Sequence, residues 1–195
     1  MLYLDVQGPP AGKEMYMDKK PIAYTEYAGK ILEALPKGIL LTTKAGTKTN
    51  SMVIGWGTLG TNWGRPVFAV YVRESRFTKQ LLDENPAFTI NVPLEDIDPR
   101  VLSICGSRSG RDMDKLEAAG LTPVAPSVIN VPGLKELPIT LECRVIYRQP
   151  QELPLLDKEI AGRYYPPVSD GQGGEAYDTH VTYYGEIVAA YVIEE

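Results

Sequence analysis

The chain has 195 residues, a length that suits one domain with a substantial hydrophobic core. Hydrophobic residues make up 44% and charged residues 23%, as in ordinary globular proteins, and a net charge of −5 without basic runs argues against nucleic-acid binding. No apolar stretch could span a membrane, no signal peptide opens the chain, and the two distant cysteines match no disulfide or metal pattern, which favours one cytoplasmic domain over residues 1–195.

The N-terminal part is expected to hold an irregular arm, one helix and a β-hairpin. Residues 1–20 lack a regular pattern and contain Gly8-Pro9-Pro10, so we expect an irregular N-terminal arm there. Apolar residues recur at helical spacing over 25–35, just before a proline that stops the helix. Two strand-like stretches with Lys44-Ala45-Gly46 between them predict a hairpin over 38–56.

The middle of the chain is predicted to alternate strands with short helices. The nearly continuous apolar run at 65–73 predicts a strand buried on both faces. The segment 74–86 has helical spacing with Ser75 placed to cap its start, and 87–93 alternates like a strand. Two further helices are predicted over 98–106, with Asp98 as cap and Gly106 as terminator, and over 109–121, with Asp112 as cap and Gly120 as terminator.

The C-terminal part contributes two more strands. Alternation over 139–147 predicts a half-buried antiparallel strand, a Gly- and Pro-rich loop follows over 162–178, and 180–193 forms the final strand. Many strands with a few short helices, and no internal repeat or linker, predict a mainly β fold with short helices (α+β), arranged as a barrel with helical decoration.

Familiar catalytic motifs are missing from the sequence. There is no glycine-rich dinucleotide fingerprint after a strand, no P-loop, no H-E-x-x-H and no C-x-x-C. A single histidine, His180, leaves little room for a Ser-His-Asp triad, and we expect it to be a plain polar residue. Cys105 is expected to be a buried structural cysteine. Classical hydrolysis and zinc chemistry are therefore disfavoured.

Residues 50–66, NSMVIGWGTLGTNWGRP, contain both tryptophans and four glycines. Glycine suits a backbone that turns sharply or approaches a flat ligand closely, so this stretch could lie against a planar heterocycle. Asn50, Ser51 and Thr58 would then offer side-chain hydrogen bonds. The alternative is a tight bend at a barrel corner with the tryptophans as core filler.

Two further stretches resemble anion sites. Residues 73–79, RESRFTK, place hydroxyls and cations at a predicted helix start, where free N–H groups and the helix dipole favour a phosphate. The alternative there is a capped surface helix with solvated basic residues. Residues 106–115, GSRSGRDMDK, repeat this chemistry, although Asp112 and Lys115 could equally form an exposed ion pair.

Taken together, these stretches resemble the flavin reductase-like family of FMN-binding split barrels, particularly its flavoredoxin-like branch. The resemblance runs from about Pro36 to Val192 and keeps its order, in the pieces TNSMVIGWGTLG, RPVFAVYVRESRFTKQLL, FTINVP, CGSRSGRDMDKLEAAGLT, LPITLECRVIY and HVTYYGEIVAAYV. It implies an FMN-binding split β-barrel, a homodimer with FMN near the subunit interface, and NADH, NADPH or another electron donor as reductant.

The resemblance also assigns roles to particular residues, and it implies no catalytic side chain because the flavin supplies the chemistry. It implies that the isoalloxazine ring and ribityl chain lie on Asn50, Ser51, Gly55, Trp56, Gly57 and Thr58, that the phosphate is held by Arg73, Ser75, Arg76 and Thr78, and that the loop with Ser109, Gly110, Arg111, Asp112 and Lys115 closes over the site.

Three functions share this FMN cradle. The first is an FMN-dependent oxidoreductase that takes hydride from NAD(P)H and passes electrons to a flavin or another acceptor. The second is an electron carrier between redox proteins, as in flavoredoxin. The third is a non-catalytic module that stores or senses flavin. Neither nucleic acid nor a membrane is an expected partner, and a homodimer is expected in each case.

Overall fold

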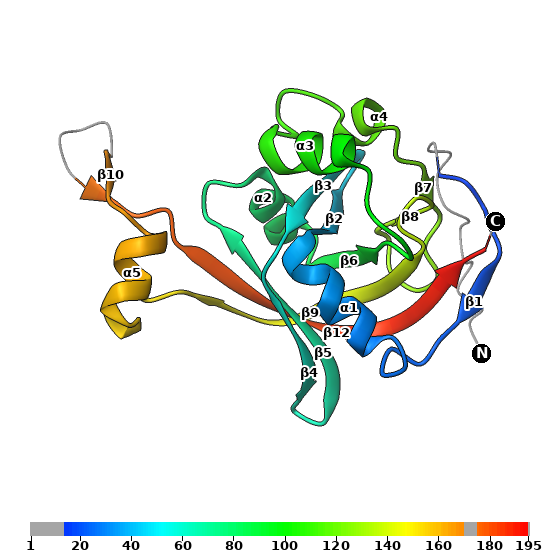
Figure 1. Ribbon diagram of the computed structural model, residues 1–195, viewed down its shortest axis with the longest axis horizontal. Coiled ribbons are helices and arrows are strands. Elements are labelled where there is room, and N and C mark those ends of the chain that lie inside the picture. Colours follow the sequence, from blue (N-terminus) through cyan, green and yellow to red (C-terminus); the bar gives the residue numbers. More distant parts are fainter. Residues whose placement is uncertain (1–13, 170–174, 195) are drawn as a thin grey trace, which may run out of the picture.

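The computed structural model describes residues 14–169 and 175–194, which form an eight-stranded antiparallel sheet with short helices around it (Figure 1). The strands are β1 (Lys19–Pro21), β2 (Ile39–Ala45), β3 (Lys48–Ile54), β4 (Gly57–Asn62), β5 (Arg65–Arg73), β6 (Ala87–Val92), β9 (Ile139–Pro150) and β12 (His180–Ile193), with the short pairs β7 (Pro123–Val124) and β8 (Gly133–Leu134), and β10 (Val168–Ser169) and β11 (Glu175–Ala176). The α-helices are α1 (Ala28–Ala34), α2 (Phe77–Glu84), α3 (Pro99–Ser107), α4 (Lys115–Ala119) and α5 (Lys158–Tyr164), and the 3₁₀ turns are η1 (Leu35–Lys37) and η2 (Leu153–Leu155).

The sheet is curled but open. Its strand order is β3-β2-β6-β9-β12-β5-β4, with β1 added beside β12. The two ends of this order, β3 and β4, follow one another in the chain and are joined only by Gly55 and Trp56. Each of them therefore presents an edge of its backbone that no strand of this order covers. The predicted mainly β class is confirmed, and the opening lies at the glycine-rich stretch.

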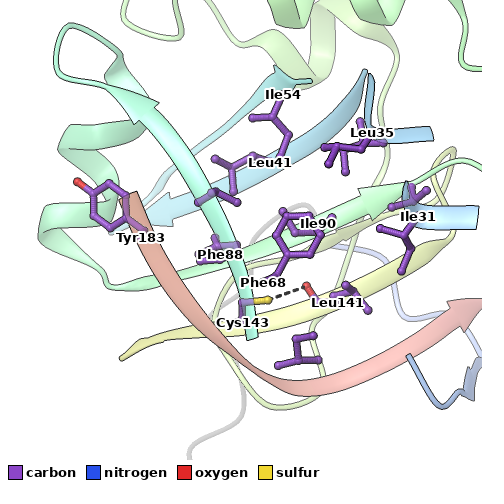
Figure 2. Close-up of a cluster of buried hydrophobic side chains, with 14 of the residues drawn as sticks. Ile31, Leu35, Leu41, Ile54, Phe68, Phe88, Ile90, Leu141, Cys143 and Tyr183 are labelled. Carbon is purple, nitrogen blue, oxygen red and sulfur yellow. Dashed lines mark hydrogen bonds between the residues drawn. The ribbon is translucent and has the colours of Figure 1, made fainter. Parts of the chain in front are cut away.

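The interior of the curled sheet is an apolar core (Figure 2). Phe68, Phe88 and Leu141 come from three different strands and are completely buried. β12 passes so close to this core that a Cβ at Gly185 would lie 2.4 Å from the Phe88 ring. Truncating either phenylalanine to alanine is expected to cost about 3–5 kcal/mol of stability. This core fixes the strands that carry the site.

A second apolar cluster places α3 and α4 against the outside of the sheet near β3. Leu40, Val101, Cys105 and Leu116 are all buried there. The expectation of a buried structural Cys105 is confirmed. Packing α3 and α4 in this way brings the loop between them, residues 108–114, beside β3 and the start of α2. Of the helices in the described part of the chain, none is both long and apolar enough to cross a membrane.

Several predicted elements are confirmed with close boundaries. The final strand occupies His180–Ile193, β5 occupies Arg65–Arg73, and β2 and β3 form the predicted hairpin. Asp98 caps α3 through the Arg100 N–H, and Gly120 ends α4 in the left-handed conformation. Period-2 and period-3.6 patterns, with caps, were sufficient to find these elements.

Other predictions were wrong in detail. The N-cap of α2 is Arg76, because Ser75 binds Asp178 instead. Gly106 lies inside α3, and α4 is capped by Asp114, whose carboxylate reaches two N–H groups, where Asp112 was predicted.

The two segments expected to be irregular also contain regular structure. Lys19–Pro21 of the expected N-terminal arm pairs with β12, while residues 1–13 lie outside the described part. The loop expected over 162–178 contains the end of α5 and the β10–β11 pair, and its residues 170–174 also lie outside the described part.

Candidate functional site

Three adjoining hollows lie at the opening between β3 and β4. The middle hollow, of about 210 Å³, is lined by Met52, Val53, Ile54, Gly55, Trp56, Tyr71, Arg73, Arg76 and His180. It shares Met52, Val53 and Arg76 with a basic hollow of about 190 Å³ at the start of α2. It shares Gly55, Trp56 and Tyr71 with an aromatic hollow of about 630 Å³ beside α5. The sequence stretch 50–58 thus runs along all three hollows.

The basic hollow is lined by several cationic side chains. Arg76, Arg108, Arg111 and Lys115 line it, and none of its described lining residues is a carboxylate. The Lys115 ammonium is buried and donates to the carbonyl oxygens of Cys105 (2.9 Å) and Arg108 (3.3 Å). Burial lowers the pKa of Lys115, and the neighbouring Arg76 lowers it further. A buried ammonium that meets only carbonyls is best compensated by a bound anion.

The start of α2 adds hydrogen-bond donors to the basic hollow. Arg76 precedes the helix in an extended conformation, and no side chain caps the N–H groups of the first turn. Thr78 lies in that turn, and its Oγ1 accepts a hydrogen bond from Asn50 Nδ2 at 2.8 Å. Because Asn50 supplies this bond, the Thr78 hydroxyl hydrogen is left to donate to a ligand.

Asn50 and Gly110 form a close contact across the basic hollow. The Asn50 side-chain oxygen is buried and has no hydrogen-bond partner in the part of the chain that the structure describes. A Cβ at Gly110 would lie 2.2 Å from that oxygen and 3.0 Å from the Phe77 ring. Only glycine lets the α3–α4 loop approach β3 this closely. The unpaired oxygen suits a ligand hydroxyl.

The 50–58 stretch divides between the core and the hollows. Ser51 is fully buried and hydrogen-bonds to Thr42 at 2.7 Å, so it does not line a hollow. A Cβ at Gly57 would lie 2.7 Å from the Phe68 ring, which makes this glycine a requirement of the core. Gly55 has open space, and its nearest neighbour is a carbonyl oxygen at 3.8 Å.

The tryptophans are not core filler. Trp56 is 43% exposed and lines the middle and aromatic hollows, and Trp63 is 59% exposed at the turn between β4 and β5. Thr58 also lines the aromatic hollow, where its hydroxyl lies 3.2 Å from the Tyr71 hydroxyl. The alternative that the tryptophans fill a core is therefore wrong, because both side chains are exposed.

Two of the residues assigned to a phosphate hold another part of the chain. Arg73 donates to the carbonyl oxygens of Asp178 (2.6 Å) and Tyr164 (3.0 Å). Ser75 donates to the Asp178 carboxylate from its N–H (3.0 Å) and its hydroxyl (2.8 Å). Both residues thereby anchor the α5 segment, which we define as residues 151–169 and 175–179 (Figure 1). Arg73 also reaches the middle hollow.

The α3–α4 loop contacts the start of α2 through Arg111. Its guanidinium donates to the Ser75 carbonyl oxygen (3.2 Å) and lies over the Phe77 ring. Ser109 accepts from the Arg111 N–H and, through its carbonyl, from the Asp112 N–H. Ser109, Gly110 and Arg111 line the basic hollow, whereas Asp112 is exposed and is not among its lining residues.

His180 is a site residue that the sequence did not reveal. It is 6% exposed, lines the middle hollow and hydrogen-bonds through Nδ1 to the Tyr165 hydroxyl at 2.7 Å. Burial lowers the pKa of His180 to about 4, and the Arg73 and Arg76 charges act in the same direction. The ring is therefore neutral at pH 7.

Other lining residues were also missed. Met52 and Val53 lie on β3, Tyr71 on β5, and Gln151 and Tyr164 in the α5 segment. Met52 and Val53 stand inside the 50–66 stretch, so their strand position was the available signal. Nothing local to Gln151 or Tyr164 indicates a site, because a distant residue holds the backbone of each: Gln151 N–H donates to the His180 carbonyl, and Arg73 donates to the Tyr164 carbonyl.

Comparisons with known proteins agree with this fold. The model of the family described as "Flavin reductase like domain" matches residues 32–195. Flavoredoxin of Desulfovibrio vulgaris (Miyazaki F) is similar at 21% identity, with a TM-score of 0.59 over 96% of this chain and 78% of that one. A putative flavin reductase with a split barrel domain from Shewanella frigidimarina NCIMB 400 is similar at 19% identity, with a TM-score of 0.60 over 81% of this chain and 67% of that one.

A curated relative is the uncharacterized protein of Archaeoglobus fulgidus that is 31% identical over 99 residues. That match covers 51% of this chain and 55% of the relative, so the chain spans about half the length of this curated protein. The open sheet described above is the split barrel of these solved structures.

Proposed function

This chain belongs to the flavin reductase-like domain family, and from that premise we propose that it is an FMN-binding flavoprotein oxidoreductase. The observation that carries the proposal is the basic hollow at the start of α2, which continues into the middle hollow along β3. An elongated ligand with a phosphate at one end and a planar ring at the other matches this succession of surfaces.

The residues present fit FMN on three counts. Arg76, Arg111 and Lys115 supply positive charge for a phosphate, together with the Thr78 hydroxyl and the free N–H groups of α2. The buried, unpaired oxygen of Asn50 suits a hydroxyl of the ribityl chain. The uncovered edge of β3, from Met52 to Gly55, offers backbone groups to the polar edge of the ring.

Bound FMN would supply the hydride and electron chemistry. The chain would bind and orient it. N–H groups on the uncovered edge of β3 favour negative charge beside them, which assists reduction. Trp56 and Tyr71 would border the ring on the side of the aromatic hollow. His180 is neutral at pH 7, so it adds no positive charge to the middle hollow.

The cofactor proposal is tested by titrating the purified protein with FMN and with riboflavin, which lacks the phosphate. We expect FMN to bind at least tenfold more tightly, because charge-assisted hydrogen bonds to a phosphate contribute about 1.5–3 kcal/mol each. Equal affinity for the two flavins would contradict the phosphate site and leave only the ring site.

We propose NADH or NADPH as the electron donor and a flavin or another small molecule as the acceptor. Anaerobic mixing with either dinucleotide is then expected to bleach the flavin absorbance rapidly. If both dinucleotides leave the flavin oxidised and a reduced redox protein bleaches it, the protein is an electron carrier instead. If neither donor reduces the bound flavin, the protein is a flavin-binding module.

We also propose a homodimer, with FMN near residues of both chains. The support is an aromatic cluster of the exposed Trp63 and Tyr147 with the half-buried Tyr184, whose ring centroids lie 5.4–5.9 Å apart. Tyr184 stands in the stretch VTYY and belongs to this cluster, whereas Tyr183 beside it and Tyr191 of the stretch AAYVI are buried within their own chain. Sedimentation of the protein and of Trp63→Ser tests the proposal, since we expect the variant alone to dissociate at micromolar concentration.

For the location, we propose the cytoplasm. Cys105 and Cys143 are both buried and unpaired, which supports a compartment where thiols stay reduced. A fusion to a fluorescent protein, followed by fractionation of the cells, tests this location.

A further inference from the structure

The outer edge of β4 is uncovered and uncharged. β4 lies at the end of the strand order, and no other strand of the described chain pairs with its outer side. Edge strands usually carry a lysine, a proline or a bulge that prevents pairing with another chain. β4, with the sequence GTLGTN, has no charged residue and no proline, and its register with β5 runs without a bulge. This edge is therefore open to the addition of another strand.

The turn after β4 shows which backbone groups face outward. Trp63 and Gly64 have positive φ angles of 51° and 69°, as in a two-residue type I′ hairpin turn. The pair that flanks such a turn is hydrogen-bonded, and the next pair, Thr61↔Pro66, is not, which suits a proline without an N–H. Because the two kinds of pair alternate, the residues whose N–H and C=O groups face away from β5 are Gly57, Leu59 and Thr61. Outside that ladder, no backbone hydrogen bond of the described chain involves them.

The composition of this edge suits a second copy of the same chain. In a two-fold antiparallel pair each strand faces its own sequence, so a charged residue would lie close to the same charge on the partner. β4 avoids this repulsion because none of its residues is charged. A register centred on Leu59 places Gly57 opposite Thr61 of the second copy. Every outward-facing N–H and C=O group of one copy then meets a partner on the other.

The same register gives a role to the exposed tryptophan at the hairpin turn, which projects from the barrel (Figure 1). Trp63 is 59% exposed, and bulky residues rarely adopt its left-handed backbone conformation. Pairing centred on Leu59 carries the turn of the second copy past Gly57 toward Trp56, which lines the middle and aromatic hollows. Trp63 of the second copy would then be covered, at the rim of the opening beside β3.

We propose that β4 pairs antiparallel with β4 of a second copy, around a two-fold axis at Leu59, so that the two sheets become continuous across the dimer. The proposal rests on the homodimer of the proposed function, and it names the contact strand and its register. It places the hairpin turn of one copy, with Trp63, beside the proposed flavin site of the other.

Cross-linking between two cysteine variants tests the register. In this pairing Thr58 lies opposite Gly60 of the second copy in a non-hydrogen-bonded pair, with Cα atoms about 4.5 Å apart, a distance that a disulfide can span. Co-expressed Thr58→Cys and Gly60→Cys chains should therefore form disulfide-linked dimers under mild oxidation. Either variant alone should not, because identical positions are then offset by two residues along the strand, beyond the about 7 Å that a disulfide tolerates.

The chain offers a clean background and a matched control for this cross-linking. Both positions are exposed, and a Cβ at Gly60 would meet no atom within 4 Å. The native Cys105 and Cys143 are buried and should not react. Gly29→Cys, at an equally open position on α1, is the control and should not cross-link to Thr58→Cys.

A proline tests the backbone contact itself. Thr61→Pro removes an outward-facing N–H and places a ring against the second strand, while the pair with Pro66 loses no hydrogen bond. The Kd of the dimer should rise at least tenfold in sedimentation, because each copy loses a hydrogen bond to the other. Thr61→Val keeps the N–H and should leave the Kd unchanged, and circular dichroism checks that both variants fold.

Sedimentation and FMN titration of the unmodified chain keep the proposals separate. A dimer that is cross-linked only by the mixed cysteine pair supports β4 as the contact strand. A dimer that this pair does not cross-link, or that Thr61→Pro does not weaken, overturns the inference and keeps the homodimer. A monomer overturns both and leaves the edge to solvent or to a strand of another protein. Mixed cross-linking without FMN binding would reject the proposed cofactor and keep this inference.

Discussion

Replacing Arg76 with alanine tests whether the basic hollow holds a phosphate. Arg76 lines both the basic and the middle hollow, and within the described chain no hydrogen bond or ion pair engages its guanidinium. Arg73, Arg111 and Lys115, in contrast, already donate to carbonyl oxygens. The guanidinium of Arg76 is therefore more available to a ligand than those three cations, and replacing it with alanine breaks no hydrogen bond within the described chain.

The size of the effect follows from the exposure of Arg76. A charge-assisted hydrogen bond contributes about 1.5–3 kcal/mol, and the low end applies because Arg76 is exposed and must be ordered by the ligand. We therefore expect FMN to bind about tenfold more weakly to Arg76→Ala, since about 1.4 kcal/mol corresponds to a factor of ten. Riboflavin, which has no phosphate, should bind equally to both proteins.

Fluorescence titration of FMN and riboflavin, with circular dichroism as a check on folding, measures this difference. Arg65→Ala is the matched control, because Arg65 forms a surface ion pair with Glu186 away from the hollows. Thr78→Val is a poorer test, since it would leave the buried Asn50 amide without its acceptor and destabilise the protein. If Arg76→Ala loses affinity for both flavins equally, or for neither, the phosphate does not lie at Arg76.

Three further predictions concern the same site. Gly110→Ala should weaken FMN binding at least tenfold and lower the melting temperature, because its Cβ would lie 2.2 Å from the Asn50 oxygen; unchanged titrations and melting curves would count against this contact. Lys115→Met should weaken FMN but not riboflavin in the same titration, and should preserve or raise stability, since it removes a buried ammonium without a carboxylate partner. Folding lowers the pKa of His180 from 6.5 to about 4. Between these two values the histidine is protonated in the unfolded chain but neutral in the folded one, so the free energy of unfolding falls as the pH drops from about 6.5 toward 4. Relative to His180→Phe, urea unfolding should show about 2 kcal/mol of additional loss between pH 7 and pH 5, and parallel pH profiles of the two proteins would contradict it.

The sequence alone determined the elements whose signals are local. Strict patterning gave the limits of β5 and β12, and Asp98 and Gly120 were recognisable as caps because their hydrogen bonds and backbone angles involve only neighbouring residues. Family motifs also directed attention to the 50–58 stretch and to the start of α2. A helix or strand is decided within a few residues, so this information is present in any short window of the chain.

The tertiary structure alone decided what those residues do. The sequence predicts that Ser75 caps α2, but its N–H and hydroxyl groups donate instead to the carboxylate of Asp178, 103 positions away. The sequence predicts that Gly57 lies against a ligand, but the structure shows that a side chain there would collide with the Phe68 ring of the adjacent strand. The opening of the barrel exists because two consecutive strands lie at opposite ends of the strand order. These roles depend on which residues from distant parts of the chain accept hydrogen bonds from the same donors or occupy the same space. The packing of the whole chain determines that, and no short window of sequence contains it.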